Sequence, residues 1–109
     1  MADTYKILGQ SNPTAATLTD LYVVPAATAA ILASITVCNR SATPTTFRLS
    51  LAIAGAADAN QQYIAYDVAI GANEAKAFTY GVSLAATDKV RCYATLATLS
   101  FNAFGLERT

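Results

Sequence analysis

AILASITVCNRSATPTTFRLSLAI, at residues 30–53, contains two runs in which successive side chains alternate between two classes. Such a period of two is typical of a β-strand with one covered face, because neighbouring side chains on a strand point to opposite sides. Pro44 and its polar neighbours separate the two runs, and proline cannot take part in the pairing of a central strand. The pattern predicts a β-hairpin over residues 30–53.

The alternation also divides this hairpin into an apolar face and a polar face. Ile31, Ala33, Ile35 and Val37 would share the apolar face of the first run. The expected core residues are Ile35, Val37, Phe47, Leu49 and Leu51. The opposite face would carry Ser34, Thr36, Cys38, Arg48 and Ser50, a surface of low charge that a neighbouring subunit could cover. A second layer is needed to cover the apolar face.

The rest of the chain continues in short alternating runs. They lie at about residues 4–8, 17–24, 61–70, 74–82, 90–95 and 99–106, with turn-forming residues between them. About eight short strands without a helical pattern predict an all-β fold: a two-sheet antiparallel β-sandwich, jelly-roll-like or immunoglobulin-like. We expect residues 14–109 to form a single domain, and residues 1–13 to form an N-terminal arm or a short first strand.

Composition limits the classes of partner. Charged residues make up only 13% of the chain, against roughly 25% in an average soluble domain, and the net charge is zero. Nothing in this balance attracts nucleic acid or an anionic membrane, and no apolar run has the length of a membrane helix. Low charge protects a monomer poorly from association. We therefore expect contact with other proteins, including copies of the chain, and no nucleic acid or membrane partner.

The residues that usually carry catalysis are scarce. The chain has no histidine and two cysteines, too few for a zinc site, and no phosphate-binding glycine pattern. Asp67 and Glu74 are the one candidate carboxylate pair, which we interpret as solvated turn charges. We expect no cofactor, no metal and no enzymatic activity.

Two cysteines and one short motif have structural interpretations. Cys38 falls on the polar face of its strand, whereas Cys92 shares a face with Val90 and Ala94, so we expect free thiols rather than a disulfide. The residues Asn39-Arg40-Ser41 match a glycosylation acceptor pattern, which we interpret as a turn.

Several segments resemble small virion proteins of tailed bacteriophages, including phages of cyanobacteria. The resemblance rests on residues 21–26 (LYVVPA), 37–41 (VCNRS), 45–48 (TTFR), 63–67 (YIAYD), 84–88 (LAATD) and 100–105 (SFNAFG), and it extends over nearly the whole chain. It implies a virion component, either a capsid decoration (cement) protein or a part associated with the tail.

These observations lead to one main expectation and one alternative. The main expectation is a non-enzymatic cement protein, made in the host cytoplasm, that self-associates as a homotrimer or homodimer and bridges major capsid protein subunits on the capsid exterior. Its expected contact residues are Tyr5, Ile7, Leu8, Thr36, Arg48, Tyr63, Tyr66 and Tyr80. The alternative is a tail- or fibre-associated module that binds a host glycan or receptor through Tyr63, Tyr66 and Tyr80, although tyrosine is also a common strand residue.

Overall fold

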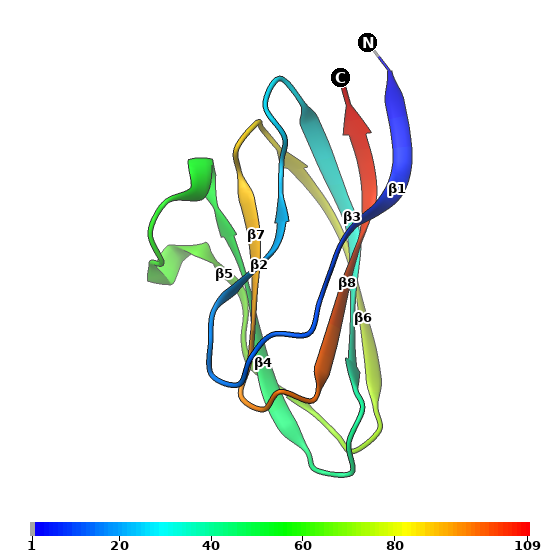
Figure 1. Cartoon of the computed structure of the whole chain (residues 1–109), viewed down its shortest axis with the longest axis vertical. Coiled ribbons are helices and arrows are strands. Elements are labelled where there is room, and N and C mark those ends of the chain that lie inside the picture. The colour runs from blue at the N-terminus through cyan, green and yellow to red at the C-terminus, as the bar shows by residue number, and fades with distance from the viewer. Residues whose placement is uncertain (1) are drawn as a thin grey trace.

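The computed structural model describes residues 2–109, which form a β-sandwich (Figure 1). Within this range there are eight strands: β1 (Asp3–Ser11), β2 (Thr19–Val23), β3 (Ala29–Asn39), β4 (Thr45–Ala52), β5 (Tyr63–Ile70), β6 (Ala75–Leu84), β7 (Lys89–Ala94) and β8 (Leu99–Arg108). Two single 3-10 turns, η1 (Ile53–Gly55) and η2 (Asn60–Gln62), lie between β4 and β5. The predicted all-β, two-sheet antiparallel sandwich is confirmed.

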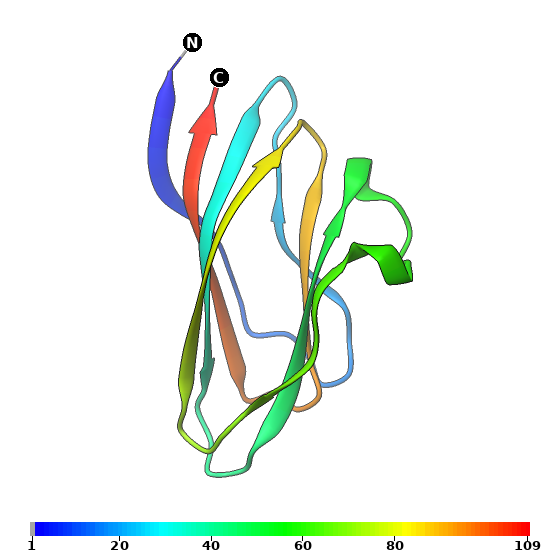
Figure 2. The same ribbon diagram turned by 180° about the vertical axis from the view of Figure 1, so that it is seen from behind.

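The strands form two four-stranded sheets, which Figure 2 shows as separate layers. Sheet A has the order β1-β8-β3-β6, and sheet B has the order β2-β7-β4-β5. The consecutive strands β3 and β4 therefore belong to opposite sheets, and the predicted hairpin over residues 30–53 is wrong. Alternation shows only that each strand has one buried face. Two such strands can be neighbours in one sheet, or they can lie in opposite sheets with their buried faces packed against each other across the core.

The segment that carries the chain from sheet A to sheet B is organised by Asn39. Its side chain is 1% exposed, and its Nδ2 donates to the carbonyl oxygens of Thr43 (2.9 Å) and Gly71 (3.0 Å). Its Oδ1 accepts from the backbone N–H of Ser41 at 3.1 Å. These bonds satisfy a buried amide and fix the crossover, so the interpretation of residues 39–41 as a turn is confirmed.

The core lies between the two sheets and is centred on Phe47. The Phe47 ring is 0% exposed and lies 5.8 Å from the Phe78 ring and 6.0 Å from the Phe101 ring, measured between centroids. The other expected core residues are also found there: Ile35, Val37 and Leu49 are fully buried, and Leu51 packs against the core from a partly buried position.

A β-bulge changes which side chains of β3 face inward. Leu32 and Ser34 pair with the consecutive residues Gly105 and Phe104 of β8, so Ala33 is an extra residue in β3. One extra residue reverses the alternation. Leu32 and Ile35 are consequently both buried, while Ile31 is 40% exposed. The prediction that Ile31 shares the apolar face of Ile35 is therefore wrong.

The sequence predicted either an N-terminal arm or a short first strand at residues 1–13. In the structure, strand β1 lies within this range. This strand pairs with β8 from Asp3 to Ser11 and forms one edge of sheet A. Ala2 and Thr109 lie side by side, since the backbone N–H group of each donates to the carbonyl oxygen of the other, and strands β1 and β8 run next to each other (Figure 1). Leu8 is 8% exposed and belongs to the core.

Both cysteines are free thiols, as expected, with Cys38 exposed and Cys92 buried. Burial raises the pKa of the Cys92 thiol to about 11. The thiolate is the reactive form, so this group resists alkylation both because it is protonated and because reagents cannot reach it.

Iodoacetamide at about pH 8 should therefore modify Cys38 and leave Cys92 intact in the folded protein. Mass spectrometry should find one adduct on the native chain and two on the chain unfolded in urea. Equally fast modification of both cysteines in the native state would show that Cys92 is not enclosed between the sheets.

Candidate functional site

The two outer faces of the sandwich differ in their charge. We define the A face as the outward-facing side chains of sheet A, assigned from the pairing register and the burial pattern. It comprises Asp3, Tyr5, Ile7 and Gln10 of β1; Ser100, Asn102, Phe104, Leu106 and Arg108 of β8; Ala29, Ile31, Ser34, Thr36 and Cys38 of β3; and Ala75, Ala77, Thr79, Gly81 and Ser83 of β6.

The only charged residues of the A face are Asp3 and Arg108, and they neutralise each other. The Arg108 Nε donates to Asp3 Oδ1 at 2.6 Å, and Nη2 donates to Oδ2 at 2.8 Å. These hydrogen bonds hold the pKa of the Asp3 carboxyl below its ordinary value. Because the pair lies in the last row of the face, the remaining surface consists of neutral polar and apolar groups.

The A face also carries a contiguous apolar patch, which we define as Tyr5, Ile7, Ile31, Phe104 and Leu106. Tyr5, Leu106 and Ile31 form one row across β1, β8 and β3, and Ile7 pairs with Phe104 in the next row. The side chains of Tyr5, Ile7 and Ile31 are 80%, 52% and 40% exposed. A hollow of about 190 Å³ adjoins the patch, lined in part by Ile31, Leu84 and Leu106.

The outer face of sheet B carries charges that are paired with one another. Arg48 of β4 forms an ion pair with Asp67 of β5, with 2.7 Å between Nε and Oδ1. Its guanidinium carbon lies 4.1 Å from the ring centroid of Tyr66 and 4.5 Å from that of Tyr93, on the strands to either side of β4. Arg48 is therefore held by one carboxylate and two aromatic rings, which stabilise it as part of the sheet.

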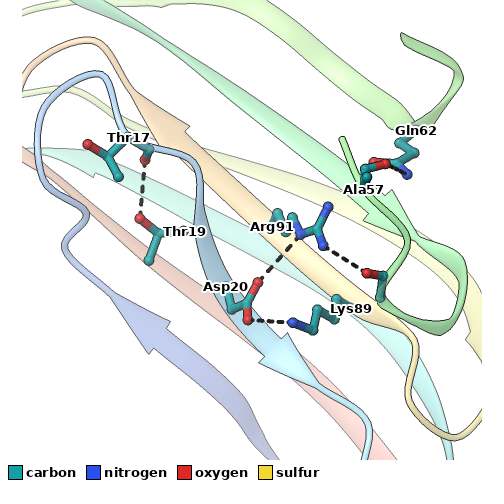
Figure 3. Close-up of polar contacts among 8 residues, drawn as sticks. Thr17, Thr19, Asp20, Ala57, Gln62, Lys89 and Arg91 are labelled. Carbon is teal, nitrogen blue, oxygen red and sulfur yellow. Dashed lines mark hydrogen bonds and ion pairs between the residues drawn. The ribbon is translucent and has the colours of Figure 1, made fainter. Parts of the chain in front are cut away.

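A second charged group on the same face ties the strands to the loop after β4 (Figure 3). Asp20 of β2 pairs with Lys89 (3.1 Å) and with Arg91 (3.5 Å) of β7. The Nη2 of Arg91 also donates to the carbonyl oxygen of Gly55 at 3.2 Å. The charges of this face therefore serve local structure, in contrast to the neutral A face.

The eight expected contact residues do not form one surface. Tyr5, Ile7 and Thr36 lie on the A face, whereas Arg48, Tyr63 and Tyr66 lie on sheet B. Tyr80 packs against the core from sheet A, where its ring is stacked on Phe78 with 6.2 Å between the centroids, and Leu8 is in the core as well. The expectation that Thr36 and Arg48 share one face is wrong, because β3 and β4 belong to different sheets.

Three residues of the apolar patch were not among the expected contacts: Ile31, Phe104 and Leu106. The bulge at Ala33 turns Ile31 outward, and alternation alone does not reveal a bulge. The sequence alone could have indicated that Phe104 is exposed, because a period of two places it with Ser100 and Asn102 on the polar side of its strand. A large apolar side chain on a polar face is the informative observation.

The two carboxylates considered as a pair have separate roles. Asp67 is bound to Arg48 within β5 rather than in a turn, and the Oε1 of Glu74 accepts from the backbone N–H of Gly71 at 2.7 Å. Among residues 2–109, no group of three or more His, Cys, Asp or Glu side chains could hold a metal ion. Over the same residues, no helix has the length and apolarity to cross a membrane.

Comparisons with models of protein families, with curated protein sequences and with solved structures found no match. The A face, with its apolar patch and its single ion pair at the margin, is the surface of the described residues best suited to contact another protein.

Proposed function

We propose that the chain is a non-enzymatic virion structural protein, a capsid cement protein that attaches through its A face to an uncharged surface of the major capsid protein. The observation that carries the proposal is the apolar patch on a sheet face without unpaired charge. This patch holds three of the seven large apolar side chains that are substantially exposed in the described part of the chain: Tyr5, Ile7 and Ile31.

Such a face is suited to a protein partner for an energetic reason. Burying a charge requires removal of its hydration, which costs several kcal/mol unless the charge is paired. On the A face the one ion pair is already formed within the chain, at its margin. Burial of the patch stabilises a complex by roughly 25 cal/mol for each Å² of apolar area removed from water. The hollow beside Ile31 offers a place for an apolar anchor of the partner.

The resemblance to small tailed-phage virion proteins supports the choice of a capsid as the partner. The low content of charge agrees with a protein whose surface is largely covered after assembly. The surface of Tyr63, Tyr66 and Tyr80 expected for the glycan-binding alternative is divided between the two sheets, because Tyr63 and Tyr66 lie on sheet B while Tyr80 belongs to sheet A. The three tyrosines cannot form a single stacking surface.

Exchange of Ile7 for lysine should reduce the number of copies bound per particle by at least about tenfold, because an unpaired charge would then be buried in the interface. The measurement adds purified protein to virions of the encoding phage from which the protein has been stripped. Ile53→Lys is the matched control: Ile53 is 81% exposed, lies in η1 outside the A face, and should leave binding unchanged.

Two outcomes would contradict the proposal. Absence of the chain from purified virions, measured by mass spectrometry, would overturn the virion assignment. Binding that is equal for Ile7→Lys and wild type would show that another surface attaches to the particle.

A further inference from the structure

The sandwich has four edge strands, and they are protected from pairing to different degrees. An edge strand presents unpaired N–H and C=O groups, and proteins protect such edges by short length, bulges, charged side chains or a covering segment. In sheet B, β2 has only five residues and includes the ion-paired Asp20. The other edge, β5, shifts register twice against β4 and holds Asp67 at a φ of 50°. Both edges of sheet B are therefore poorly suited to pairing.

In sheet A, the β1 edge is also protected. A register shift lies between Ile7 and Gly9, and Lys6 in the middle of the strand is bound to Glu107. The backbone of Gly9 approaches that of Leu21 so closely that a Cβ on this glycine would lie 2.0 Å from the Leu21 carbonyl oxygen. The segment around β2 therefore closes this side of the sandwich.

The opposite edge, β6, is the longest of the four, and apart from one register shift it has few of these protective features. It has ten residues, no proline and a single charged side chain, Lys76, near its start. Its pairing with β3 is uninterrupted from Ala75 to Thr79, and the one register shift falls at Tyr80 and Gly81. Its outward side chains are small and exposed, and a Cβ at Gly81 would meet no atom within 4 Å. Among the described residues, β6 pairs with β3 on one side and with no strand on the other.

We propose that β6 pairs with β6 of a second copy, antiparallel about a twofold axis near Thr79, to form a homodimer with a continuous eight-stranded sheet. The strand is complementary to itself in this arrangement. With Thr79 at the axis, Phe78 faces Tyr80 of the second copy, an aromatic cross-strand pair of a stabilising kind. Lys76 faces Val82 of the second copy, so the two lysines stay apart.

The role of this dimer on a capsid rests on the proposed function as a cement protein. Pairing at β6 places two A faces side by side on one sheet, so that a single dimer presents two apolar patches. Two linked contacts hold a particle more tightly than one, because the second contact forms within the bound dimer. Of the two oligomers expected from the sequence, the homodimer is the one that this closed, isologous pairing produces.

The test measures the mass of the full-length protein in solution by analytical ultracentrifugation at micromolar concentration. The wild type should be a dimer. Thr79→Lys and Thr79→Glu should each raise the dissociation constant of the dimer at least about tenfold, because two like charges meet at the axis. An equimolar mixture of the two variants should form a heterodimer. Formation of this heterodimer would show that both variants are folded and that charge repulsion, rather than unfolding, weakens their homodimers.

Thr4→Lys and Thr4→Glu are the matched controls, since Thr4 is exposed on β1 at the other edge of sheet A. These variants should remain dimers. A monomeric or trimeric wild type, a dimer unaffected by either Thr79 variant, or equal dissociation of the Thr4 and Thr79 variants would overturn the proposal. The ultracentrifugation uses no virus particles, so it tests the dimer alone. The binding of Ile7→Lys to particles tests the proposed function separately.

Discussion

Substitution of Phe47 by alanine should lower the free energy of unfolding by about 3–5 kcal/mol, measured by urea denaturation. The Phe47 ring is fully buried and contacts the rings of Phe78 and Phe101, so it joins sheet B to sheet A at the centre of the core. Its removal loses the transfer free energy of the ring and leaves a cavity that two hydrogen-bonded sheets cannot close. For a domain stabilised by roughly 5–15 kcal/mol, the loss is a large part of the total.

Tyr5→Ala is the control for this substitution. It also removes an aromatic ring, but the Tyr5 side chain is 80% exposed, so the free energy of unfolding should change by only about 0.5 kcal/mol. The same variant should bind particles more weakly, because Tyr5 belongs to the apolar patch. Similar losses of stability in Phe47→Ala and Tyr5→Ala would contradict the placement of the core between the two sheets.

The prediction of Phe47 as a core residue succeeded because β4 pairs with β7 in one unbroken register from Phe47 to Ala52, so Phe47 and Leu49 alternate with Arg48 as a regular strand requires. The pairing partners of that strand, in contrast, are not determined by its own sequence. Whether β4 pairs with β3 or packs across the core from it depends on contacts with strands that come much later in the chain, β7 and β5. Local alternation does not contain this information, which is why the class of fold was predictable and the hairpin was wrong.

The candidate site was partly missed for a related reason. Leu8 was an expected contact, whereas Ile31 was expected on the apolar face of its strand with Ile35; in the structure Leu8 is buried in the core and Ile31 is 40% exposed. In β3 the extra residue Ala33 reverses the alternation and turns Ile31 outward. Leu8 points inward because it directly follows the outward-facing Ile7, which becomes clear only once residues 3–11 are known to be a strand paired with β8. The neutral character of the A face was also hidden, because it appears only when β1, β8, β3 and β6 are known to be neighbours. Tyr5 and Ile7, which precede the β1 irregularity, are both exposed on the A face.

Gly105→Ala should lower the free energy of unfolding by about 3 kcal/mol, at the upper end of the effects of steric overpacking. A Cβ on Gly105 would lie 1.9 Å from the carbonyl oxygen of Ile31 and 3.0 Å from its carbon. Both are backbone atoms of the neighbouring strand β3, so no side-chain rotation can relieve the overlap. The central strands β3 and β8 would have to separate at the position where the apolar patch is built on them.

Gly81→Ala is the matched substitution, and it should leave stability unchanged or raise it by a few tenths of a kcal/mol. Gly81 has no positive φ, and an added Cβ meets open space, so alanine mainly reduces the conformational entropy of the unfolded chain. Urea denaturation of the two variants thus compares one chemical change in two surroundings. Equal stability of Gly105→Ala and Gly81→Ala would show that β8 does not approach the Ile31 carbonyl this closely. A large difference would support the strand contact that brings Ile31 beside Leu106, on which the continuity of the apolar patch depends.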